Sequence, residues 1–61
     1  MNERDFREVL HEALIMYIDD SEDVIRKIQT FEDAGVITSN EGLVIRTDDG
    51  SEFQLTIVKS K

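Results

Sequence analysis

The side chain with the widest chemical repertoire in this sequence is its single histidine, His11. Glu8 precedes it by three positions, so both groups lie on one face of a helix, and Glu-x-x-His is half of the ligand set of a di-iron carboxylate site. Such a site needs a second copy of the motif and further glutamates from other helices. The chain offers one motif. We therefore interpret His11 as an exposed side chain beside Glu8 and Glu12.

The acidic run at residues 19–23 has the spacing of the first part of an EF-hand calcium loop. Its first, third and fifth residues are Asp, Ser and Asp, which match ligand positions of that loop. The sixth position, which requires glycine, is Val24, and the twelfth, which requires glutamate, is Thr30. Because the pattern fails at both places, we interpret the run as a helix-capping cluster and expect no metal ion.

Nucleophilic chemistry has little support either. The serines have only His11 as a possible base, and nothing in their spacing suggests a Ser-His-Asp triad. Carboxylates are so abundant that their presence carries no information about acid–base catalysis, and so small a domain has scant room for a substrate pocket beside its core. We expect no catalytic residues, no cofactor and no enzymatic activity.

The charge balance excludes several classes of partner. Fourteen acidic residues against seven basic ones give the chain a net charge of −7. Duplex nucleic acid and anionic membranes repel such a surface, and no basic stripe offsets the repulsion. The longest apolar run, residues 13–18, is far shorter than a membrane span. We expect a cytoplasmic protein whose partners are neither nucleic acid nor membrane.

The length predicts a single domain, 1–61, of marginal stability. So short a chain buries only about 60% of the surface that its unfolded form exposes. Small domains often add disulfides, a metal or a second subunit, and this chain has no cysteine. Good packing or self-association must therefore supply the stability.

The first predicted element is a helix over residues 2–19, which Asn2 caps at its N-terminus. With Met16 and Ile18 included, its apolar arc covers about 200° at 100° per residue, more than one helix neighbour needs. Ile15 projects from the opposite, charged side. The periodic apolar residues are Phe6, Val9, Leu10, Ala13, Leu14 and Tyr17.

A second helix is predicted over residues 21–34, since its apolar residues recur at helical spacing and Gly35 supplies the left-handed residue that commonly ends a helix. The apolar residues of that helix are Val24, Ile25, Ile28 and Phe31. Residues 36–38 are either a short strand or an apolar segment that leads out of the helix.

A β-hairpin over residues 43–47 and 51–58 is the clearest β signal. A two-residue loop would put Arg46 on the same face as Phe53, whereas a three-residue loop with Gly50 in the left-handed position pairs Arg46 with Glu52 on the outer face. The three-residue loop is favoured, because it keeps Arg46 out of the face that buries Phe53. The predicted fold is α+β, with two helices on one face of the hairpin. The residues expected against the helices are Leu43, Ile45, Phe53, Leu55 and Ile57.

The surplus apolar surface favours a protein–protein interaction module that acts as a homodimer. One candidate surface is the hairpin edge, where two copies would build a four-stranded sheet. The other is the first helix around its outlying apolar residues. The candidate interface residues are Ile15, Met16, Val44, Thr56 and Val58.

Two alternatives belong to other classes. The first is an acidic inhibitor, of the kind that phages and mobile elements encode, which displays carboxylates in place of the phosphates of nucleic acid. A contiguous acidic stripe would favour it, whereas scattered acidic residues beside an apolar patch would favour association. The second is a winged-helix fragment, for which the second helix and the hairpin tip are too acidic.

Overall fold

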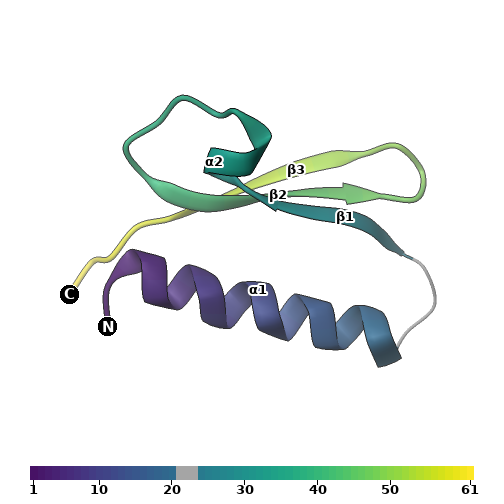
Figure 1. Ribbon diagram of the computed structural model, residues 1–61, viewed down its shortest axis with the longest axis horizontal. Helices are drawn as coiled ribbons and strands as arrows, with labels where there is room; N and C mark the ends of the chain where they lie inside the picture. The colour runs from purple at the N-terminus through teal and green to yellow at the C-terminus, as the bar shows by residue number, and fades with distance from the viewer. Residues whose placement is uncertain (21–23) are drawn as a thin grey trace.

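The computed structural model describes residues 1–20 and 24–61, and in it one long helix packs against a three-stranded antiparallel sheet. The strand order is β1-β2-β3, so each strand pairs with its neighbour in sequence (Figure 1). The predicted α+β class is confirmed. The elements are α1 Glu3–Asp20, β1 Ile25–Thr30, α2 Phe31–Ala34, β2 Glu41–Thr47 and β3 Glu52–Ile57.

The first predicted helix is α1, and its cap is the predicted one. The Oδ1 atom of Asn2 accepts a hydrogen bond from the N–H of Asp5 at 2.8 Å, which satisfies one of the free donors of the first turn. The side chains of Leu10, Leu14 and Ile18 are half-buried and recur at helical spacing, which identifies the side of α1 that packs on β2 and β3.

The second predicted helix, residues 21–34, is wrong where the structure describes it. Residues 25–30 form β1, and only the last turn is helical, as α2. A bulge interrupts the pairing of β1 with β2 between Ile25 and Lys27. The extra residue brings Ile25 and Ile28 to the same face three positions apart, which imitates the i, i+3 spacing of a helix. The capping role proposed for residues 21–23 lies outside the described residues.

The short helix α2 begins and ends with regular caps. The Thr30 hydroxyl accepts a hydrogen bond from the N–H of Asp33 at 3.1 Å, and Gly35 ends the helix at a φ of 76°. Gly35 is thus the predicted helix stop, although the helix before it is one turn long. Residues 36–38 form no strand and lead into the loop before β2.

The hairpin has the predicted three-residue loop and register. Ile45 pairs with Phe53, and Arg46 pairs with Glu52 across the outer face, with 3.1 Å between Nε and Oε1. Gly50 has a φ of 88°, the left-handed value that the bulge requires. In the loop, hydrogen bonds from the Thr47 hydroxyl and the Ser51 N–H hold the pKa of the Asp49 carboxyl below its usual range.

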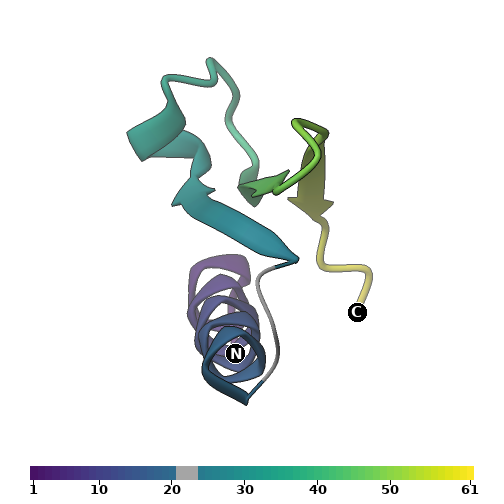
Figure 2. The same cartoon turned by 90° about the vertical axis from the view of Figure 1, so that its right-hand side faces the viewer.

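The two helices lie on opposite faces of the sheet, which corrects the prediction of one shared face (Figure 2). Glu41 of β2 contacts α1 through Arg7, whereas the neighbouring Gly42 faces the ring of Phe31 at the start of α2. β2 is therefore covered on both sides, and its apolar run is continuous because neither face meets water. The core residues are Phe31, Leu43, Val44 and Ile45.

Within the described residues, no helix has the length and apolarity needed to cross a membrane.

Candidate interaction surface

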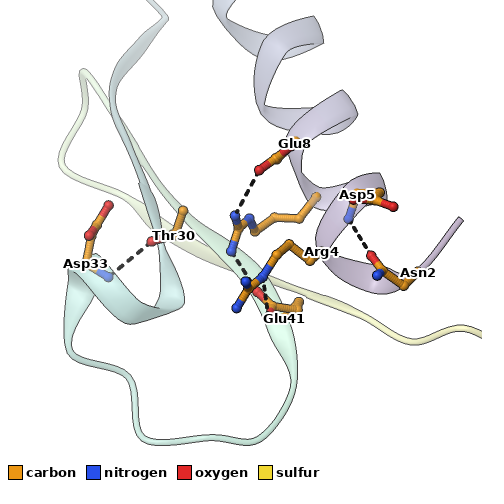
Figure 3. Close-up of polar contacts among 8 residues, drawn as sticks. Asn2, Arg4, Asp5, Glu8, Thr30, Asp33 and Glu41 are labelled. Carbon is orange, nitrogen blue, oxygen red and sulfur yellow. Dashed lines mark hydrogen bonds and ion pairs between the residues drawn. The ribbon is translucent and has the colours of Figure 1, made fainter.

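An ion-pair cluster fixes how α1 sits on the sheet. Nη1 of Arg7 donates a hydrogen bond to Oε1 of Glu41 at 2.7 Å, and the Arg7 side chain is only 13% exposed. Arg4 and Glu8 extend the cluster at 3.8 Å from Glu41 and Arg7 respectively (Figure 3). The buried Nε of Arg7 has no partner among the described residues. Burial of a guanidinium is costly unless it is paired, so the Glu41 contact fixes the rotation of α1 about its axis.

This rotation leaves a row of large apolar side chains of α1 in solvent. We call Phe6, Val9, Met16 and Tyr17 the apolar stripe. Each is between 47 and 64% exposed, and at 100° per residue they fall within an arc of about 100°. Phe6, Val9 and Tyr17 belong to the periodic apolar series of the predicted helix. The half-buried side of α1 includes Arg7 and His11, so part of the apolar arc is displaced outward.

A groove adjoins the stripe between α1 and β3. Phe6 and Leu10 line it from the helix, and Leu55, Ile57 and Val58 line it from β3 and the segment that follows. Its volume is about 620 Å³. Lys59, Lys61 and Glu3 also border it, so the apolar floor has charged residues of both signs at its border. We call this space the β3 groove.

β3 forms one edge of the sheet, and half of its main-chain groups are free. The N–H of Thr47 donates to the carbonyl of Ser51 at 2.9 Å, which closes the hairpin. Because antiparallel pairs alternate between hydrogen-bonded and non-hydrogen-bonded positions, Phe53, Leu55 and Ile57 direct their main-chain groups toward β2. Those of Glu52, Gln54 and Thr56 point to the open edge. Phe53 was predicted to be covered, but it is 55% exposed because none of the described elements packs beyond this edge.

The structure separates the five candidate residues predicted from the sequence. Met16 belongs to the apolar stripe, and the exposed Val58 lines the β3 groove. Thr56 is exposed on β3 and also lines the β3 groove. Ile15 is exposed but lies on the other flank of α1, half a turn from Phe6. Val44 is 4% exposed in the core, so it is not available on this surface.

The described side chains with metal-binding potential do not form a site. His11 is half-buried on the sheet side of α1 rather than exposed, because the rotation set by Arg7 turns it inward. Glu8, expected beside His11, lies near Arg7. Among the described residues, no three acidic or histidine side chains are grouped as metal ligands. The acidic run at residues 19–23 falls largely outside those residues.

The sequence contained one signal for this surface. An apolar arc of about 200° is wider than a single sheet contact can cover, so part of it had to remain uncovered. The part of the apolar arc that stays exposed depends on the pairing of Arg7 with Glu41 of β2. The spacing of apolar residues within α1 does not predict that contact.

Comparison of the chain with protein-family models, with curated proteins and with solved structures found no match.

Proposed function

We propose that this chain is a protein-interaction module that self-associates as a homodimer through the apolar stripe and the β3 groove. The observation that carries the proposal is the exposure of four large side chains on one flank of α1, continuous with an apolar groove. Contiguous exposed apolar patches of this kind mark interaction sites more often than scattered single residues do. In a two-fold dimer the same patch serves both copies.

The energy available from the stripe sets the strength of the contact. Full burial of a large apolar side chain contributes about 1.5–3 kcal/mol, so completing the burial of four half-exposed ones contributes about 3–6 kcal/mol per copy. Association itself costs about 4–15 kcal/mol in lost freedom. The stripe alone therefore supports weak association, and a stable dimer needs contacts from the β3 side as well.

The two alternative functions have less support. Among the residues whose exposure the structure describes, exposed acidic side chains lie on α1, on α2 and at the hairpin tip, and such scattering disfavours a nucleic-acid mimic. The winged-helix interpretation loses its recognition helix, because residues 25–30 form β1. We also propose a cytoplasmic location, which suits a small domain without cysteine and hence without disulfides.

Sedimentation tests the proposal. We expect the wild-type chain to sediment as a dimer at hundreds of micromolar, and Val9→Glu to sediment as a monomer with an unchanged circular dichroism spectrum. Ile15→Glu is the matched control, because it adds the same charge to the opposite flank of α1 and should leave the dimer intact. A wild-type monomer at those concentrations, or a dimer that tolerates Val9→Glu, would overturn the proposal.

A further inference from the structure

The two open edges of the sheet differ in how well they are protected against pairing. β1 carries a bulge between Ile25 and Lys27, and the side chains of Arg26 and Lys27 are exposed there. Bulges and charged side chains, lysine above all, are the usual devices that prevent strand addition. β3 pairs in regular register from end to end, with neither bulge nor proline in Glu52–Ile57. The unprotected edge is therefore β3.

The charges around β3 favour one direction of pairing. Asp48, Asp49 and Glu52 lie at its start, and Lys59 and Lys61 follow its end. Antiparallel pairing of two copies places the acidic end of each strand beside the basic end of the other. Parallel pairing would place like charges together, which is destabilising. The charge pattern thus favours antiparallel pairing of β3 with β3 of a second copy.

The geometry of such a pair also accounts for the exposed Phe53. Residues directly opposite in an antiparallel pair share a face, so a two-fold pair places one residue opposite itself. With Gln54 at the axis, Phe53 faces the partner's Leu55, and with Leu55 at the axis it faces the partner's Ile57. Leu55 and Ile57 both line the β3 groove. Either register therefore brings Phe53 of one copy to the groove of the other.

Resting on the proposed function, we infer that the dimer forms by antiparallel addition of β3 to β3 of a second copy. The two three-stranded sheets become one sheet of six strands, and the free main-chain groups of Gln54 and Thr56 find partners. Phe53 of each copy occupies the β3 groove of the other, beside Phe6 and Leu10 of that copy. This corrects the four-stranded sheet expected from the sequence, because β1 adds a third strand to each copy.

A proline substitution tests the strand pairing without touching the monomer. The N–H of Gln54 points to the open edge, and proline is tolerated on an edge strand where its N–H would face solvent. We expect Gln54→Pro to keep the circular dichroism spectrum of the wild type and to weaken dimerisation by about tenfold or more, since symmetry removes the hydrogen bond twice. Gln54→Ala, which keeps the N–H, should change the strength of dimerisation little.

Amide hydrogen exchange of the wild type provides a readout that does not depend on a variant's folding. The N–H groups of Gln54 and Thr56 should gain protection as protein concentration rises, whereas that of Ile28, which faces the β1 edge, should not. If Val9→Glu dissociates the dimer while Gln54→Pro does not, and the β3 amides stay unprotected, the strand pairing is wrong and the interaction module stands. A wild type that never dimerises overturns both.

Discussion

At the scale of single residues, Gly42 is tightly enclosed by its neighbours. A Cβ atom there would overlap the ring of Phe31 on one side and the carbonyl oxygen of Leu55 on the other. The contact with Phe31 lets α2 close directly on the central strand, and it covers that face of β2. A side chain as small as a methyl group cannot be added without moving the ring and the β3 backbone.

Gly42→Ala should therefore destabilise the domain by about 1–3 kcal/mol, the usual cost of overpacking a core. Urea denaturation measures the change as a lower midpoint at constant slope. In a Phe31→Ala background the same substitution should cost less, because one of the two overlaps is gone. A Gly42→Ala variant as stable as the wild type would contradict the close packing of α2 on β2.

At the scale of elements, the position of α1 depends on the contact between Arg7 and Glu41. The two residues are 34 positions apart in sequence, and the pair is largely shielded from solvent on the arginine side. An exposed ion pair contributes little, but a charge-assisted hydrogen bond to a mostly buried guanidinium is stronger. The pair also decides which apolar side chains of α1 are covered by the sheet.

A double-mutant cycle on Arg7→Met and Glu41→Gln should give a coupling free energy of about 1–2 kcal/mol. Arg4→Met with Glu41→Gln is the matched cycle, and it should give a smaller value, because the Arg4 side chain is mostly exposed and 3.8 Å away. Equal coupling in both cycles would mean that Arg7 does not anchor the helix. Thermal unfolding of the single and double variants supplies the data.

The same elements show which parts of the fold could be predicted from the sequence. α1, its Asn2 cap and the register of the hairpin were predictable, because each depends on residues close in sequence. β1 was not, because its partner β2 is distant and its bulge gives isoleucines a helical spacing. A signal of the third strand is the run Leu43-Val44-Ile45, whose lack of alternation is typical of a strand covered on both faces.

The candidate surface was only partly predictable for a similar reason. The excess of apolar residues on α1 was visible in the sequence, and Met16 and Val58 were placed on the surface as expected. Phe53 was expected against the helices but is exposed, because an apolar pattern shows which side chains share a face but not how far a neighbouring element extends over them. That extent depends on the tertiary contacts of Arg7 and on the sheet ending at β3.

At the scale of the whole molecule, the proposed dimer brings together two chains of net charge −7. Their long-range repulsion opposes association at low ionic strength and is largely screened at physiological salt, where the Debye length is about 8 Å. Close pairs between the acidic start of one β3 and the lysines after the other are screened less. Net charge and local charge pattern therefore act in opposite directions.

Two charge reversals separate these effects. Lys59→Glu and Lys27→Glu each lower the net charge of −7 by two, so they add the same long-range repulsion. Lys59 follows the end of β3, beside the acidic end of the partner's strand, whereas Lys27 lies on β1, beyond β2. We expect Lys59→Glu to weaken dimerisation by roughly fivefold more than Lys27→Glu, equivalent to about 1 kcal/mol of local charge pairing. Sedimentation equilibrium at physiological salt measures both dissociation constants. Equal losses would leave net charge as the only electrostatic influence and would remove the argument for antiparallel pairing, because only the local pattern distinguishes one end of β3 from the other.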